Sequence, residues 1–142
     1  MSENESIVTV RAFLEAMGRG RREDLREAYD RFLADDCVYE NTGLPTFRTK
    51  AETMAFFFSD MTPDKGIVSI GVDLHHIAAA GDVVFTERTD HHYDASGADI
   101  LTPKICGVFE VAGGKFKRWA DYFDPGPMLH LFETKPLVGE DV

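Results

Sequence analysis

The second half of the chain constrains the fold most, because it contains long, β-branched-rich runs separated by very short turns. The turns fall at Ala80-Gly81-Asp82, Ala95-Ser96-Gly97 and Gly113-Gly114. They delimit strands at about 67–79, 83–93, 99–112 and 115–123. Short glycine-containing turns connect neighbouring strands of a hairpin, and strands of this length are unusual in globular proteins. The pattern therefore predicts a four-stranded meander in a strongly curved sheet.

The first half of the chain has the periodicity of amphipathic helices. Apolar residues recur three or four positions apart from Ile7 to Met17, and Gly18 and Gly20 end that pattern. A second helix has apolar positions at Leu25, Ala28, Tyr29, Phe32 and Leu33. A first strand is expected at about 36–41. A third helix begins at the capping box Thr49-Lys50-Ala51-Glu52. Its apolar positions are Met54, Phe57, Phe58 and Met61.

Helices followed by a curved sheet define an α+β architecture, in which the sheet wraps over the N-terminal helices as a helix-backed cone. A length of 142 residues suits a single domain, so we expect one domain over residues 1–142. The break at Pro125-Gly126-Pro127 precedes a short helix at 128–132, which would close the open end of the cone. From about residue 135 the tail is expected to be loose.

Charge and cysteine usage exclude several classes of function. The formal net charge of −10 argues against nucleic acid and anionic membrane surfaces as partners. No apolar run approaches the roughly 18 residues that a membrane helix needs, so we expect neither export nor membrane insertion. Cys37 and Cys106 lie in apolar strand patterns without a Cys-x-x-Cys spacing. Buried thiols in a reducing, cytoplasmic environment are the prediction.

Three strand-like segments place polar side chains at positions where a packed core would have apolar ones. Tyr39 and Asn41 are two apart on one strand, Arg88 and Asp90 are two apart on another, and Asp121 lies on a third. Residues two apart in a strand point to the same face of a sheet. If these faces turn inward, two carboxylates, a guanidinium, a phenol and a carboxamide share the interior. That set of groups is suited to proton transfer.

The order and neighbours of these residues resemble the limonene epoxide hydrolase family, within the NTF2-like and SnoaL-like fold group. The resemblance spans most of the chain. It rests on Val38-Tyr39-Glu40-Asn41, Glu87-Arg88-Thr89-Asp90, Cys106-Gly107-Val108-Phe109-Glu110-Val111 and Trp119-Ala120-Asp121-Tyr122-Phe123-Asp124. It implies an NTF2-like cone with a mixed sheet, and a homodimer as in many family members.

The resemblance implies a cofactor-independent hydrolase that opens a small hydrophobic epoxide with water to a vicinal diol. Asp90 would protonate the epoxide oxygen, Asp121 would deprotonate water, and Tyr39 and Asn41 would hold that water. The residue types agree with this reaction, because it needs two carboxyl groups in opposite protonation states. Arg88 can lie between the two carboxyl groups and keep one of them ionised. No Gly-x-Ser-x-Gly segment suggests a covalent route. We expect no metal and no cofactor.

Candidate walls of a substrate pocket are Ile105, Trp119, Phe123 and Leu129, each of which is equally explicable as core. By strand parity His92 shares the face of Arg88 and Asp90, where a terpene-epoxide enzyme is expected to have an apolar wall. The identity of the substrate is therefore open. Lys104 is expected to face solvent, and part of Phe56-Phe57-Phe58, or the outer face of the sheet, to form a subunit contact.

Three other interpretations remain open. The first is a purely structural role, in which an ion network is formed by Arg88, Asp90 and Asp121. Such networks contribute little net stability, however. An isomerase or cyclase similar to ketosteroid isomerases or SnoaL-like cyclases needs one acid or base and has no use for a bridging arginine. A noncatalytic binding module is the third, since the fold decides no function. His75-His76 and His91-His92 are not expected to bind metal, because adjacent strand residues point to opposite faces.

Overall fold

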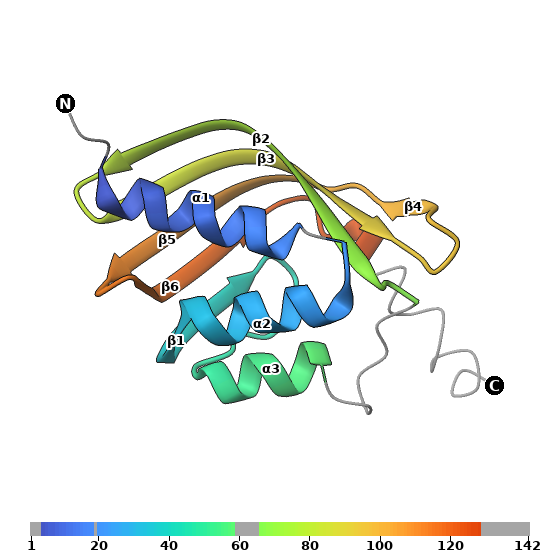
Figure 1. The fold of residues 1–142 in the computed structure, drawn as a ribbon, viewed down its shortest axis with the longest axis horizontal. Coiled ribbons are helices and arrows are strands. Elements are labelled where there is room, and N and C mark those ends of the chain that lie inside the picture. Colours follow the sequence, from blue (N-terminus) through green and yellow to red (C-terminus); the bar gives the residue numbers. More distant parts are fainter. Residues whose placement is uncertain (1–3, 19, 59–65, 129–142) are drawn as a thin grey trace.

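Three helices and six strands make up the described part of the protein, which is a computed structural model covering residues 4–18, 20–58 and 66–128 (Figure 1). The helices are α1 (Glu5–Met17), α2 (Arg22–Phe32) and α3 (Lys50–Phe58). The strands are β1 (Leu33–Asn41), β2 (Ser69–Ala80), β3 (Val83–Tyr93), β4 (Asp99–Leu101), β5 (Lys104–Ala112) and β6 (Lys115–Tyr122). The predicted positions Met61 and Leu129, the helix end beyond residue 128 and the tail lie outside the described residues.

The strands form one mixed sheet with the order β1-β6-β5-β3-β2, and β4 pairs with β3 beside this path. The run β2-β3-β5-β6 is antiparallel throughout, which confirms the predicted meander. Strand β1 comes from the helical half of the chain and pairs in parallel with β6. This pairing brings the polar end of β1, with Tyr39 and Asn41, alongside the polar end of β6.

Helices α1 and α2 cover one face of the curved sheet, which confirms the α+β architecture (Figure 1). The core between the layers is largely aromatic. Phe13 on α1 is fully buried and its ring contacts Phe116 and Trp119 of β6, with ring centroids 5.0 Å apart in both pairs. Phe109 of β5 packs on Trp119 at 5.4 Å. Burying such large rings supplies much of the driving force for folding, and these rings belong to the hydrophobic core.

Helix boundaries mostly follow the predicted signals. Asn4 caps α1 by accepting from Ser6 N, and Gly18 ends it. At α3 the amide of Glu52 donates to Thr49 Oγ1 over 3.1 Å, as the capping box predicts. Leu33 was expected to extend the second helix, but it begins β1, because its backbone is extended while its N–H still donates to Tyr29 O.

The predicted strand at 99–112 is two strands, because Thr102 and Pro103 interrupt it. Proline has no backbone N–H and breaks a ladder. A residue of this interruption forms a backbone hydrogen bond to β3: the N–H of Asp90 donates to Pro103 O over 3.1 Å. The break in the strand therefore fixes the backbone of a candidate site residue.

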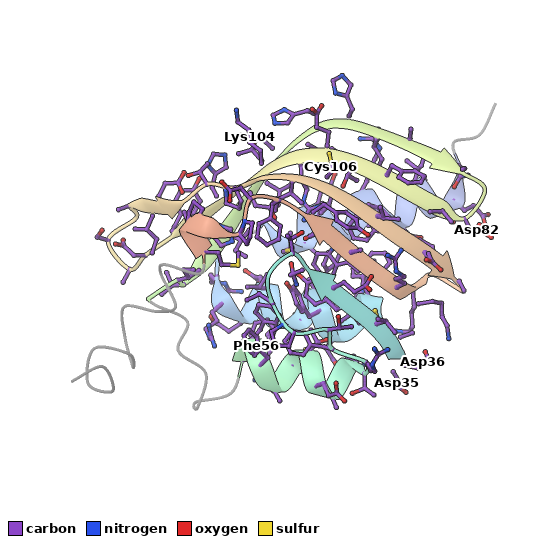
Figure 2. The ribbon with its side chains drawn as sticks, turned by 180° about the vertical axis from the view of Figure 1, so that it is seen from behind. Asp35, Asp36, Phe56, Asp82, Lys104 and Cys106 are labelled. Carbon is purple, nitrogen blue, oxygen red and sulfur yellow. The ribbon has the colours of Figure 1, made fainter. Side chains whose placement is uncertain are left out.

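Two predictions about side-chain orientation are wrong. Cys106 is exposed, not buried, because Ile105 and Gly107 take the inward positions of β5; Cys37 is buried as expected. Figure 2 shows Cys106 and Lys104 on the side of the sheet away from the helices. His75 and His76 also share the outer face, where they contact Thr89 and Glu87, because a register shift between Leu74 and His76 breaks the alternation.

Candidate active site

Arg88 binds two carboxylates at once on the concave face of the sheet. Its Nε donates to Asp90 Oδ1 over 2.9 Å and its Nη2 to Asp90 Oδ2 over 3.3 Å. The same Nη2 donates to Asp121 Oδ2 over 2.6 Å. Asp90 is on the same strand as Arg88, whereas Asp121 comes from β6, two strands away. A single guanidinium therefore joins two acids that the sequence separates by thirty-one residues.

These three side chains are almost completely removed from solvent. The Arg88 side chain is 0% exposed, that of Asp90 7% and that of Asp121 4%. Burial raises the pKa of Asp121, and the opposing effect of Arg88 does not cancel it. Burial by itself lowers the pKa of Arg88, but the two carboxylates outweigh that effect and raise its pKa. Arg88 thus stays a cation between the acids, as a bridging role requires.

Gly107 and Thr86 shape the space that the guanidinium fills. A Cβ atom on Gly107 would overlap Arg88 Nη1 and would lie 2.8 Å from Asp121 Oδ1 and 2.9 Å from Thr86 Oγ1. Arg88 Nη1 donates to Thr86 Oγ1 over 3.2 Å. The missing side chain therefore admits the fork of Arg88, and the threonine hydroxyl holds it in one orientation.

On the other side of Asp121, strand β1 supplies hydrogen-bonding groups. The parallel register pairs Tyr39 with Trp119 and Asn41 with Asp121. Asn41 Nδ2 is buried and has no hydrogen-bond partner among the described residues. An unpaired buried donor is costly, and it marks a position where a ligand or water oxygen is bound favourably. The register places Asn41 directly across from Asp121.

Trp119 and Tyr39 hold Asp121 and each other in place. Trp119 Nε1 donates to Asp121 Oδ1 over 2.8 Å, and its ring stacks on Tyr39 with centroids 4.1 Å apart. The hydroxyl of Tyr39 lies 3.5 Å from that of Tyr29. Burial raises the pKa of both phenols, so they stay neutral and are able to donate as well as accept hydrogen bonds.

A cavity of about 110 Å³ opens in front of these groups. Asp90, Asp121, Tyr39 and Asn41 line it, and so do four of the predicted wall residues, Ile105, Trp119, Phe123 and His92. The phenylalanines of α3 line it as well. Phe56 packs against Phe47 with centroids 4.8 Å apart and is half-buried; Figure 2 labels its position on the helical side. The cavity walls are mainly apolar, and the charged residues that line it are Arg22, Asp90 and Asp121.

His92 faces this cavity through a ring fixed by the backbone. Its Nδ1 lies 2.8 Å from the carbonyl oxygen of Leu101 in β4. The residue is only 8% exposed, and burial lowers its pKa, which favours the neutral ring. An imidazole therefore stands on the wall two positions beyond Asp90, as strand parity predicts.

Among the described residues, no group of three or more His, Cys, Asp or Glu side chains is arranged to hold a metal ion. None of the described helices is both long and apolar enough to cross a membrane.

Four supporting residues were missed by sequence reasoning: Tyr29, Thr86, Gly107 and the indole N–H of Trp119. Thr86 shares the face of Arg88 two residues away, so the alternation already places it there. Gly107 lies inside a strand, where glycine often marks the close approach of another group. Both signals were present in the sequence. The contact of Tyr29 with Tyr39 carries no such local signal, because a helix and a strand must pack together to form it.

Comparison with known proteins shows the family of this chain. The chain matches the limonene-1,2-epoxide hydrolase catalytic domain over residues 4–133. It is 38% identical over 120 residues to epoxide hydrolase EphG of Mycobacterium tuberculosis, covering 81% of this chain and 70% of that protein. A solved LEH-like epoxide hydrolase of M. tuberculosis superposes with a TM-score of 0.66 at 36% identity, covering 89% and 88% of the two chains.

A more distant structure shares the fold alone. An NTF2-like protein of unknown function from Burkholderia pseudomallei superposes with a TM-score of 0.72 at 21% identity, covering 92% of this chain and 98% of that one. Fold and site together define an NTF2-like α+β enzyme with a buried acid–arginine–acid cluster. Within that class, the chain belongs to the limonene-1,2-epoxide hydrolase family and is an epoxide hydrolase.

Proposed function

We propose that the chain opens a small hydrophobic epoxide to a vicinal diol in one step, by general acid and general base attack of water. The observation that carries the proposal is the bridging by Arg88 of Asp90 and Asp121, which both line a mainly apolar cavity. With both acids ionised the cluster has a net charge of −1, so burial favours one added proton on the pair. One acid and one base then coexist at neutral pH.

Asp121 is proposed as the base and Asp90 as the acid. Asn41, with its unpaired buried donor, is the register partner of Asp121, so a water held by Asn41 lies beside Asp121. The raised pKa of Asp121 makes it a stronger base than an exposed aspartate. Tyr39 is proposed to share in holding the water. Because Asp121 is assigned as the base, Asp90 is proposed to protonate the oxygen of an epoxide in the cavity.

The proposed step is balanced in protons and bonds. Asp121 takes a proton from water while the water oxygen bonds to an epoxide carbon. The C–O bond of the ring breaks, and its oxygen takes the proton of Asp90. The products are the diol, a protonated Asp121 and an ionised Asp90, and one proton returns from Asp121 to Asp90 before the next turnover. Arg88 keeps a single positive charge between the acids throughout.

The test is diol formation from limonene, cyclohexene and styrene oxides by wild type, Asp90→Asn and Asp121→Asn. General acid–base catalysis contributes about 10²–10⁴-fold, so each variant is expected to lose at least that lower factor. Glu87→Gln is the matched control, because Glu87 is adjacent to Arg88 but exposed on the outer face. Full activity of either aspartate variant would refute the assigned role.

A single turnover in ¹⁸O-labelled water separates this route from a covalent one. Direct attack by water puts the label into the first diol formed. A carboxylate nucleophile would instead deliver its own unlabelled oxygen in that first turnover. Unlabelled diol would therefore refute the one-step mechanism while leaving epoxide hydrolysis intact.

We also propose that the protein forms a homodimer through the outer face of its sheet. Phe85 on β3 is 47% exposed and Tyr122 on β6 is 51% exposed on that face, and exposed aromatic groups favour association. The phenylalanines of α3 are a weaker candidate, since they line the cavity. Light scattering of wild type and Phe85→Lys tests this surface; a wild-type monomer would refute it. The cytoplasmic location stays a prediction.

A further inference from the structure

His92 is a polar group on the cavity wall that the proposed mechanism does not use. Most of the residues that line the cavity with it are apolar, among them Ile70, Leu101, Ile105 and Phe123. Burying a polar group on such a wall is unfavourable unless it forms hydrogen bonds. One ring nitrogen of His92 has its partner in Leu101 O, and the second ring nitrogen needs an explanation.

The bond to Leu101 determines which nitrogen carries the proton. A carbonyl oxygen only accepts, so Nδ1 is the donor over that 2.8 Å contact. In the neutral ring the other nitrogen, Nε2, is then an acceptor with a free lone pair. Burial lowers the pKa of His92, which keeps the ring in this neutral form at pH 7. Nε2 has no hydrogen bond to any residue in the described part of the chain.

The other polar residues on the wall have partners or roles already. Arg22 donates to Phe57 O over 3.0 Å. Asp90 and Asp121 are held by Arg88, and Tyr39 contacts Tyr29. Asn41 offers a donor, not an acceptor, at Nδ2. Within the cavity as described, Nε2 of His92 is thus a neutral acceptor available to a bound molecule.

We propose that His92 is a specificity residue whose Nε2 accepts a hydrogen bond from a hydroxyl group of the substrate. The proposal rests on the proposed hydrolysis and refines it: the preferred substrates are apolar epoxides that carry a hydroxyl away from the ring oxygen. A site built to bind a hydroxyl discriminates against the analogue that lacks it, because the acceptor is then left unpaired.

Strand geometry sets where that hydroxyl must lie. Asp90 and His92 are two residues apart on β3, which separates them by about 6.6 Å along the strand. If Asp90 protonates the epoxide oxygen, the hydroxyl belongs several bonds from that oxygen. A hydroxymethyl group across a cyclohexane ring from the epoxide has this reach. Its isostere, with an ethyl group in the same position, differs only in a methyl for the hydroxyl.

The experiment measures kcat and KM for hydroxymethylcyclohexene oxide and ethylcyclohexene oxide of matched stereochemistry. Wild type is expected to favour the hydroxyl-bearing epoxide in kcat/KM by roughly tenfold. His92→Leu removes the acceptor and is expected to abolish or reverse this preference, mainly through KM. His92→Asn is the second variant: its amide nitrogen still reaches Leu101 O, while no acceptor remains at the Nε2 position.

Binding of the product diols gives a readout that does not need turnover. Calorimetry should show tighter binding by wild type of the triol from the hydroxymethyl epoxide than of the diol from the ethyl epoxide. That difference is expected to vanish in His92→Leu and His92→Asn. If neither epoxide is opened, the proposed hydrolysis of this class fails, and the binding comparison still decides the role of His92.

Two results would overturn the inference. One is equal kcat/KM for both epoxides in wild type together with equal binding of both products. The other is a preference for the hydroxyl that survives in both variants, since His92 would then serve only to hold Leu101 and β4. Thermal unfolding of each variant shows whether it is folded, and a folded His92→Asn is sufficient to decide.

Discussion

Two arginines on opposite faces of the same sheet each bind two carboxylates, yet their surroundings differ. Arg88 on the concave face binds Asp90 and Asp121 with a side chain that is 0% exposed. Arg118 on the convex face binds Glu40 over 2.8 Å and Glu110 over 3.2 Å with a side chain that is 32% exposed. The charge pattern is the same, and what changes is access to water.

The difference shows why only one of these clusters is a candidate for catalysis. Water screens the convex cluster, so its ion pairs are worth about 0–1 kcal/mol each. In the concave cluster the desolvation cost offsets much of the attraction, so little net stability is gained. What burial does produce there is a raised pKa at Asp121. Such perturbed groups in a cleft mark functional sites.

Replacing each arginine by methionine should give the largest difference between the two clusters. Arg88→Met leaves two buried carboxyl groups without a cation, and we expect a loss of about 3–5 kcal/mol in the free energy of unfolding. Activity should fall by roughly 10²–10³-fold or more. Arg118→Met should cost about 1 kcal/mol or less and should retain activity. Urea unfolding and diol formation measure both effects.

Arg88→Lys is the second variant, needed in case Arg88→Met does not fold. It keeps the positive charge but lacks the planar fork that reaches both acids, so it should be folded and still strongly impaired. Equal effects of the Arg88 and Arg118 substitutions on both stability and activity would contradict the contrast between the two faces.

Gly107→Ala tests the contrast with a single methyl group. The added Cβ would overlap Arg88 Nη1 and push the guanidinium away from one acid. Overpacking of this kind costs about 1–3 kcal/mol, and a displaced bridge should lower kcat roughly 10- to 100-fold. Cys106→Ala, at the preceding position but on the exposed face, is the matched control and should behave as wild type. A fully active Gly107→Ala would show that the orientation of Arg88 is not critical.

The sequence predicts the concave face better than the convex one, for a physical reason. Alternation along β3 is uninterrupted from Thr86 to His92, so residue parity alone places Arg88, Asp90 and His92 together. On β2 the alternation fails at His75, where a register shift puts two neighbouring histidines on one face. Bulges depend on pairing with the next strand, and one isolated segment does not reveal them.

Strand pairing explains what else could be predicted for the site. The meander follows from short turns, but the parallel pairing of β1 with β6 has no local turn to signal it. Asn41 and Asp121 are therefore brought together by a contact that only the family resemblance suggested. Leu33, expected in a helix, begins that same strand. Its apolar side chain fits both periodicities, and the tertiary pairing decided between them.

The pH dependence of activity should also separate the two faces. Asp121 must be ionised to accept a proton, so kcat/KM should fall as pH drops through its raised pKa. This limb should lie above the ordinary aspartate value of about 3.9, with up to tenfold loss per pH unit below it. A second limb at higher pH reports loss of the proton that the pair shares. Glu87→Gln, on the outer face, should leave both limbs unmoved; an acid limb at or below 3.9 would contradict the role of burial.

The smallest expected effect concerns His91, which is on β3 next to His92 but on the convex face. Its Nε2 lies 2.8 Å from Asp73 and its Nδ1 2.7 Å from Asp99, and these hydrogen bonds raise its pKa above the ordinary 6.5. A raised pKa in the folded state means that protonation stabilises the fold. The contribution is complete below about pH 6.5 and is lost as pH rises through the raised value.

His91→Gln should therefore lower the free energy of unfolding by less than about 1 kcal/mol at pH 5, and by still less at pH 9. Subtracting the variant from wild type at each pH removes the contribution of Asp121, which both proteins share. Added salt should shrink the difference at pH 5, because these partners are exposed. Diol formation should not change. A difference that is the same at both pH values would mean that the pairs of His91 act as neutral hydrogen bonds, and the convex face would then carry no charge-dependent stability at this position.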